Sequence, residues 1–296
     1  MNKKLTSILA SAGLLFTAAI WGFAFVVVKD TLDYIGAVYM VALRYTLAAV
    51  LMSLIFIKKW KLINKRNIIH GVFSGSLLFI AYTTQTIGCD FTTAGKNAFL
   101  TTVYVILIPI ISWILYKKRP GWYVFVAAIL SLTGIGLLAL GTGDSAGLNL
   151  GDILTLICGL FYALHIIVTA KYNESGDDTL FLTILQFCTV SVLSWIAAPF
   201  YDGKFDVHSF SSVRVILSIL YLGIFSTMIC FTLQNVGLKY VNSSLASLFL
   251  SFESVFGVLF SSIFLHERLT LRMIIGCILI FAAVILAETK FSLKSK

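Results

Sequence analysis

Apolar residues occur along this chain in long uninterrupted runs, and short polar segments separate these runs. Windows of about 18–23 apolar residues are long enough to cross the hydrocarbon core of a bilayer as helices. Because lipid offers no partner to backbone N–H and C=O groups, we expect each window to be a continuous helix. The pattern predicts an all-α polytopic membrane protein with ten transmembrane helices, at Leu9–Val28, Gly36–Ile57, Ile68–Gly88, Thr93–Leu115, Trp122–Leu140, Gly151–Ala170, Leu180–Phe200, Val213–Asn235, Ser243–Phe264 and Leu271–Ala287.

The first window also has features of a secretory signal peptide, because two lysines precede it and "ASA" lies within it. Its apolar run continues to Val28, which is longer than the apolar region of a typical signal peptide. We therefore expect it to be retained as the first span.

The two halves of the chain resemble each other. Thr83–Val105 aligns with Thr232–Ser254 at a shift of 149 residues, and nearby shifts align Leu43–Met52 with Leu185–Ser194 and Ile20–Lys29 loosely with Phe161–Ala170. The alignment predicts two five-helix repeats, residues 1–143 and 144–296, which have opposite orientations because five is odd. Inverted repeats are typical of alternating-access transporters, which bind their substrate near the bilayer midplane. A duplicated bundle without a transport role is the alternative.

Composition and charge support a membrane protein. Hydrophobic residues make up 59% of the chain and charged residues 12%, against about a quarter charged in soluble domains. The net charge of +9 does not indicate a nucleic-acid partner, because the basic residues lie in short loops. Their distribution favours cytoplasmic N- and C-termini. The basic segment Lys58–Asn67 either binds anionic lipid or only fixes this topology.

Glu253 is the most informative polar residue, because it lies in the middle of an apolar span. A charged group there is costly, and it usually faces a wet cavity or a partner. Ser247, Ser251 and Ser254 lie near Glu253 at helical spacing and form a small polar stripe with it. Glu253 is therefore either a site for a proton or a substrate ammonium, or a buried carboxyl that is hydrogen-bonded between helices.

Two aligned pairs provide further candidates. Tyr104 aligns with Glu253 and shares a helical stripe with Asn97, so both are candidates for hydrogen bonds to substrate. For Asn97 the alternative is a hydrogen bond to another helix. Gln85 aligns with Gln234, and the inversion would put them near opposite membrane surfaces. They are either symmetric gates or polar residues at span ends, where such residues cost little.

Two ionisable residues inside spans complete the candidates. His165 is either a second proton-coupling group beside Glu253 or a packing residue. Arg44 would pair with Asp33, with Glu253 or with a substrate carboxylate, or it would extend to the interface. Trp21 and Tyr82 either line an aromatic cavity or pack. The predicted substrate-binding set is Trp21, Tyr82, Gln85, Asn97, Tyr104, His165, Gln234, Ser251 and Glu253.

Several stretches together resemble one family. They are "IWGFAFVVVK" (Ile20–Lys29), "LRYTLAAVL" (Leu43–Leu51), the segment Thr83–Ser112, and "LFLSFESVFGVLFSSIFLHERLT" (Leu248–Thr270). The whole chain is similar to EamA-type members of the drug/metabolite transporter superfamily. The resemblance implies efflux of amino acids or related small metabolites through the bacterial plasma membrane. One departure is Glu253-Ser254, where the family often has Glu-Pro and a kinked helix.

The predicted function is therefore secondary transport of a small polar metabolite by alternating access, with protons as a second possible ligand. We expect no enzyme activity and no cofactor or metal, since the five cysteines are scattered singly. The rivals are a GxGD-like intramembrane aspartyl protease, from "GTGD" (Gly141–Asp144) and Tyr201-Asp202, and a membrane scaffold or sensor. The fifth and tenth spans are nearly all apolar, so we expect them at the periphery, in a monomer or a homodimer.

Overall fold

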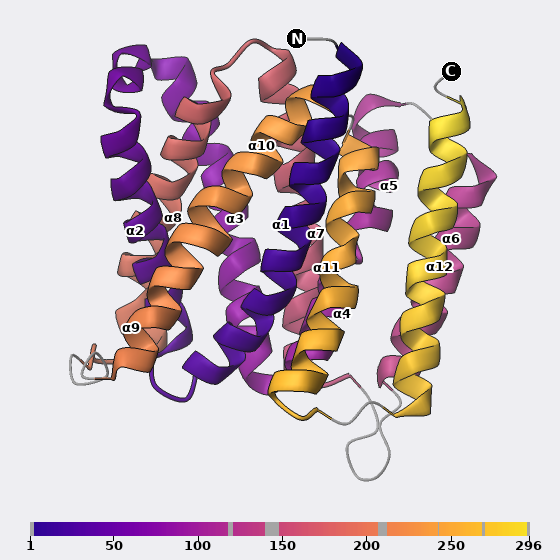
Figure 1. Ribbon diagram of the computed structural model, residues 1–296. Coiled ribbons are helices and arrows are strands. Elements are labelled where there is room, and N and C mark those ends of the chain that lie inside the picture. Colours follow the sequence, from indigo (N-terminus) through magenta and orange to yellow (C-terminus); the bar gives the residue numbers. More distant parts are fainter. Residues whose placement is uncertain are drawn as a thin grey trace.

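The computed structural model describes residues 3–117, 121–139, 148–206, 212–241, 243–267 and 270–294, and these residues form helices and connections without any strand (Figure 1). The first half contains α1 (Lys3–Thr31), α2 (Ala37–Ile55), the short 3₁₀ helix η1 (Ile57–Leu62), α3 (Lys65–Phe91), α4 (Ala94–Thr101), α5 (Tyr104–Tyr116) and α6 (Trp122–Ala139). The second half contains α7 (Leu150–Glu174), α8 (Thr179–Tyr201), α9 (Val213–Leu220), the π-helix η3 (Tyr221–Ile229), α10 (Cys230–Tyr240), α11 (Ser243–Phe264) and α12 (Leu271–Lys294).

The helices coincide closely with the predicted spans, and α11 has the predicted bounds. Within the described residues, six helical stretches are by themselves long and apolar enough to cross a membrane. The predicted spans at α3, α6, α11 and α12 do not reach this limit alone, so the number of ten spans remains a prediction. The six stretches are Ile8–Thr31, Ala37–Ile55, Ala94–Leu115, Leu150–Glu174, Thr179–Tyr201 and Val213–Tyr240.

Two spans are helical as predicted but are not regular α-helices throughout. The fourth span divides into α4 and α5 at Thr102–Val103, where the Thr102 hydroxyl donates to the Phe99 carbonyl at 2.6 Å. Such back-bonding by hydroxyls bends helices, and Pro109, inside α5, removes a further backbone donor. The eighth span contains the π-helix η3. π-Helical segments are rare, and those that occur are often found at functional sites. Hydropathy alone predicts neither the turn in the fourth span nor the π-helix in the eighth.

Polar side chains fix where several helices begin. Asn64, Thr93 and Asp178 accept hydrogen bonds from backbone N–H groups in the first turns of α3, α4 and α8, respectively. N–H groups in the first turn have no carbonyl partner within their own helix. Asn149 and Asp152 form a reciprocal capping box at the start of α7. These caps place the polar connections at the two ends of a bundle whose middle is apolar.

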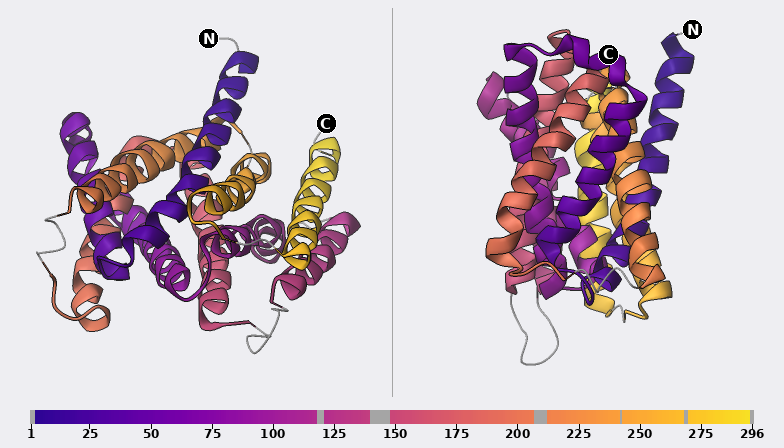
Figure 2. Two further views of the ribbon diagram at one scale, coloured as in Figure 1. Left: turned by 60° about the horizontal axis from the view of Figure 1, so that its bottom comes forward. Right: turned by 90° about the vertical axis from the view of Figure 1, so that its left-hand side faces the viewer.

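The bundle has two opposite ends. Both termini lie at one end, called the terminal end, together with η1 and the start of α3; the opposite end is called the far end (Figure 1). Equivalent helices of the two halves, α1 and α7, run in opposite directions between them (Figure 1). The pair α6 and α12 packs mainly on itself at one edge (Figure 2), as predicted for the fifth and tenth spans. The centre therefore lies among α1, α3, α7, α10 and α11.

Candidate functional site

A narrow cavity lies between the two halves of the chain. It leads from the middle of the bundle toward Val28 and Cys89, which lie near the far ends of α1 and α3. The volume open to the centre of a water molecule is only about 20 Å³, which is enough for roughly one water. Its lining includes five predicted site residues, Trp21, Tyr82, Gln85, Asn97 and Glu253, together with Ala24, Phe25, Val28, Arg44, Thr86, Cys89 and Ser226.

Glu253 lies in this cavity with an incomplete set of partners. The side chain is 3% exposed, and its Oε1 has no hydrogen-bond partner among the described residues. The Tyr104 hydroxyl lies close enough to interact with the carboxyl, but it also lacks a hydrogen bond within the described part of the chain. A buried polar atom without a partner is unfavourable. This oxygen is therefore available to a ligand or a proton.

The predicted serine stripe around Glu253 is buried. Ser247, Ser251 and Ser254 are each at most 2% exposed, and Ser254 Oγ donates to the Ser251 carbonyl at 2.7 Å. Helix α11 continues without a break from Ser243 to Phe264, because Ser254 keeps the backbone N–H that a proline would lack. Ser251, a member of the predicted substrate-binding set, is not among the residues that line the cavity.

Arg44 was missed as a member of the predicted substrate-binding set. It is 2% exposed and lines the cavity. Its Nε donates to Thr227 Oγ1 and its NH2 group to Ser226 Oγ, both at 2.8 Å. Its guanidinium lies 5.0 Å from the centre of the Tyr82 ring, a cation–π distance. No carboxylate pairs with it among the described residues, so the alternatives with Asp33 and Glu253 are wrong.

The π-helix η3 positions the groups that hold Arg44. Ser226 and Thr227 lie in this segment, and the Thr227 hydroxyl donates to the Leu222 carbonyl five residues earlier, at 2.7 Å. Trp21 Nε1 donates to the Ser226 carbonyl at 2.7 Å. One segment of the second half thus binds α1 and α2 of the first half at the cavity wall.

Aligned residues of the two halves meet beside the cavity. Ring centres are 6.1 Å apart for Trp21 and Tyr162, 5.8 Å for Tyr45 and Phe187, and 5.3 Å for Tyr82 and Phe231. In each pair the residues occupy matching positions of the repeat alignment. Such contacts arise where a pseudo-twofold axis passes between two inverted repeats, so the cavity lies beside that axis.

His165 and Gln234 lie in the half of the core toward the terminal end and do not line the cavity. Both are fully buried. Gln234 Oε1 accepts a 2.6 Å hydrogen bond from the Tyr162 hydroxyl. His165 stacks on Tyr162, and its Nδ1 has no partner among the described residues. Gln85, by contrast, is partly buried in the cavity wall, where its amide donates to Thr101 Oγ1 at 3.2 Å. The two aligned glutamines therefore have different surroundings.

All five ion pairs of the described residues join the first half of the chain to the second. At the terminal end they are Lys59–Asp178, Arg66–Asp177 and His70–Asp177. At the far end they are Lys96–Asp152, at 2.6 Å, and Arg214–Asp30. The ionic contacts at both ends would therefore change if the halves moved relative to each other.

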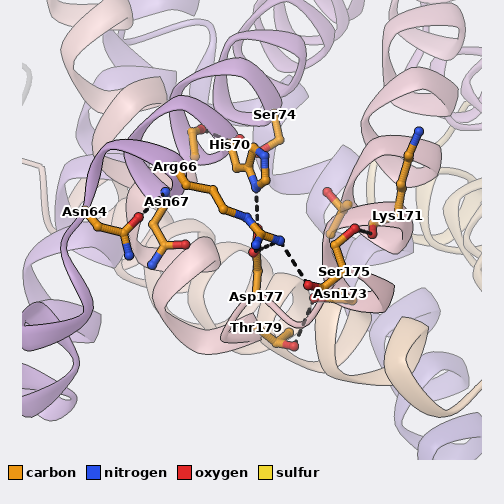
Figure 3. Close-up of polar contacts among 12 residues, drawn as sticks. Asn64, Arg66, Asn67, His70, Ser74, Lys171, Asn173, Ser175, Asp177 and Thr179 are labelled. Atoms are coloured by element: carbon orange, nitrogen blue, oxygen red, sulfur yellow. Dashed lines mark hydrogen bonds and ion pairs between the residues drawn. The ribbon is translucent and has the colours of Figure 1, made fainter.

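Asp177 is the centre of the cluster at the terminal end (Figure 3). Its side chain is 5% exposed, and it pairs with Arg66 at 3.1 Å and with His70. The His70 ring stacks on Tyr172 with centres 3.8 Å apart. Burial alone would raise the pKa of neighbouring Asp178, but hydrogen bonds from Lys59 and the Phe181 amide outweigh it and hold that pKa below its usual value. Asp178 thus remains an anionic link to the first half, beside the contacts of Asp177.

Two carboxylates at the far end cap helices of the other half. Asp202 accepts bonds of 2.8 Å from the backbone N–H groups of Val38 and Tyr39, and burial raises its pKa. Glu267, from the "HERLT" stretch, accepts from the Ala94 and Gly95 amides at 2.7 and 3.1 Å. Asp202, one of the two aspartates of the protease alternative, is therefore a helix cap. The other, Asp144, lies outside the described residues.

The buried pair Lys96–Asp152 gives a prediction about stability. Asp152 has no exposed side-chain surface, and Lys96 is 13% exposed. We expect Asp152→Asn to leave the Lys96 ammonium without a counter-charge and to lower the free energy of unfolding by about 3 kcal/mol. Asp30→Asn is the matched control, because Arg214 in that pair is 61% exposed; it should cost under about 1 kcal/mol. Denaturant unfolding in detergent measures the free energy of unfolding of both variants. Equal losses would contradict the larger contribution assigned to the buried pair.

The fold and the cavity define a class of protein: a helical membrane protein built from two matching halves. A sequence model of the EamA-like transporter family matches residues 8–140 and again residues 149–289. The chain belongs to the EamA-like transporter family, and the resemblance seen in the sequence is confirmed. It is a multi-pass membrane transporter that acts on small molecules, and it is not an enzyme.

Individual relatives support this assignment. The chain is 35% identical over 281 residues to an uncharacterized transporter of Archaeoglobus fulgidus, covering 95% of this chain and 86% of the relative. It is 24% identical to the uncharacterized transporter YoaV of Bacillus subtilis, covering 95% and 97%. A crystal structure matches with a TM-score of 0.69 at 15% identity, covering 95% of this chain and 98% of the other, which shows the fold alone.

Proposed function

We propose that this protein is a secondary transporter that binds a small polar metabolite in the central cavity and exposes it alternately to the two sides of the membrane. One observation carries the proposal. Arg44 and Glu253 both line the cavity, both are at most 3% exposed, and neither forms an ion pair, with each other or with any other described residue. Buried charges normally have a partner, so the missing partner is provided by the ligand.

The two groups indicate the chemistry of that ligand. A guanidinium recognises a carboxylate through charge-assisted hydrogen bonds, and a carboxylate recognises an ammonium group. Together they fit a zwitterion such as an amino acid, with Trp21, Tyr82, Gln85 and Asn97 around it and Tyr104 beside Glu253. The cavity is too small for an amino acid as it stands, so substrate entry requires the two halves to separate. Efflux is the direction that fits the resemblance.

The ionic contacts at the two ends provide the gates. Alternating access in inverted-repeat transporters rocks one repeat against the other around a fixed site. Opening the terminal end would break the contacts of Asp177 and Asp178, and opening the far end would break Lys96–Asp152. We also propose ten spans, with both termini in the cytoplasm of a bacterial cell and repeats divided near residue 143; the chain acts as a monomer or homodimer. His165 remains the second candidate for proton coupling.

The terminal gate can be tested at Ser74, which is fully buried and accepts a hydrogen bond from Gln186. A cysteine at position 74 should react slowly with a soluble maleimide. Adding Asp177→Asn should speed the reaction about tenfold or more, because Arg66 loses its counter-charge and His70 its carboxylate partner, so that opening becomes easier. Peptide mass spectrometry separates this label from the native cysteines. Asp30→Asn, at the far end, is the control, and equal acceleration by it would contradict a local gate.

The proposed function is tested in two steps. Thermal unfolding of the purified protein is first measured with single amino acids, since a bound ligand stabilises the folded state. A stabilising amino acid is then loaded into liposomes that contain the protein, and its flux is measured against empty liposomes. Stabilisation without flux would support a binding or sensing protein, and neither effect with any amino acid would overturn the substrate class.

A further inference from the structure

The short helix η1 separates its residues into three faces. A 3₁₀ helix has three residues per turn, so residues three apart share a face. Ile57, Trp60 and the adjoining Ile63 lie on an apolar face, and Lys58 and Lys61 lie on a basic face. Lys59 lies on the third face. The segment follows the end of α2 at the terminal end, just above α2 in Figure 1.

Two contacts fix η1 against the second half of the chain. Lys59 forms the ion pair with Asp178, and the Trp60 ring packs edge-on against Phe181 with centres 5.9 Å apart. The segment is therefore held in one orientation by residues that face the bundle. Its exposed side chains make up its outer surface: Lys58 and Lys61, and the two isoleucines that flank Trp60 at the ends of the apolar face.

That outer surface is both apolar and basic. Ile57 is 61% exposed and Ile63 is 52% exposed. Lys58, Lys61 and Lys65 are exposed, and none has an ion-pair or hydrogen-bond partner within the described chain. The nearby acids are already in use, because Asp178 pairs with Lys59, and Asp177 with Arg66 and His70. Three positive charges thus remain uncompensated beside two exposed aliphatic side chains.

We propose that η1 is a binding site for anionic phospholipids. Lys58, Lys61 and Lys65 bind the phosphate of the head group, and Ile57 and Ile63 insert at the level of the first acyl carbons. Basic clusters directly beside a membrane span attract anionic lipid, and amphipathic segments bury their apolar face at the boundary between head groups and acyl chains. A free phosphate ion would use the lysines alone and leave both isoleucines in water. This site depends on neither the direction of transport nor the substrate.

The test compares lipids that differ only in head-group charge. Thermal unfolding of the purified full-length protein is titrated with dihexanoyl phosphatidylglycerol and with dihexanoyl phosphatidylcholine, and affinities follow from the shifts. We expect tighter binding of phosphatidylglycerol. The double variant Lys58→Gln/Lys61→Gln should weaken it by about tenfold or more at low salt, since each lysine near a lipid surface contributes roughly fivefold. Binding of phosphatidylcholine should change little.

Matched controls make the outcome decisive. Lys117→Gln/Lys239→Gln removes the same charge from two exposed lysines at the same end of the molecule and should keep the preference. Ile57→Ser/Ile63→Ser should weaken both lipids. Equal binding of the two lipids by the native protein, an equal loss in the control, or binding of glycerol 3-phosphate as tight as that of the lipid would overturn the site.

Discussion

Arg44→Gln is expected to weaken substrate binding by about a hundredfold. The expectation follows from charge-assisted hydrogen bonds in a water-poor cavity, each of which contributes about 1.5–3 kcal/mol. Glutamine retains a donor for Ser226 or Thr227 but carries no charge for a substrate carboxylate. The dissociation constant is measured by calorimetry on the purified variant, with the amino acid that stabilises the native protein.

Arg44→Lys should not restore binding. The planar guanidinium reaches Ser226 and Thr227 in the second half while it also faces the Tyr82 ring, and an ammonium group cannot reproduce this geometry. Arg214→Gln is the matched control, because Arg214 also bridges the two halves but is 61% exposed at the far end. Native-like binding by a folded Arg44→Gln protein would exclude Arg44 from the site.

The sequence predicted the positions of the helices better than their internal geometry. The bounds of α11 were predicted correctly, since a long apolar run between polar segments has few alternative placements. The break at Thr102–Val103 and the π-helix Tyr221–Ile229 were missed. Both depend on which hydrogen-bond partner a backbone group takes, and a hydropathy pattern carries no information about that choice.

The candidate site could be predicted only in part, for a related reason. Helical periodicity showed that Glu253 faces other helices, but it could not show which residues those helices present. The structure brings Glu253 together with Trp21, Tyr82 and Asn97 in the cavity, whereas it places His165 in the opposite half of the core. Arg44 was identified as unusual, but several partners were open to it. Only the packing of α2 against η3 shows that the partners of Arg44 are hydroxyl groups of η3 and not Asp33 or Glu253.

The repeat alignment gives these residues a common interpretation. Aligned residues meet as aromatic pairs near the axis, but the charged positions have neutral counterparts: Gln186 aligns with Arg44, and Tyr104 with Glu253. A symmetric scaffold thus carries an asymmetric pair of charges. The symmetric part is suited to rocking between two equivalent states. The asymmetric part can bind an oriented zwitterion, which has one end of each charge.

Glu253→Gln is expected to abolish proton-driven accumulation, while exchange across the membrane continues at saturating substrate with a weaker affinity, because Glu253 also faces the substrate ammonium. Glutamine has nearly the shape of the protonated carboxyl but cannot release a proton, so a transporter that exchanges protons at Glu253 would lose its coupling. A difference of one pH unit supplies about 1.4 kcal/mol per proton, or about tenfold accumulation. Liposomes with an imposed pH difference should show this accumulation with the native protein and equal concentrations with the variant.

The control for this experiment is Glu174→Gln, which changes an exposed carboxyl at the end of α7. It should accumulate substrate as the native protein does, because Glu174 lies far from the cavity. Exchange of labelled for unlabelled substrate shows that the Glu253→Gln protein is folded and active. Accumulation by this variant that still follows the pH difference would remove Glu253 from coupling, and His165→Gln would then be the variant to compare. Loss of exchange even at saturating substrate would limit the role of Glu253 to binding the substrate ammonium, since coupling alone is not needed for exchange.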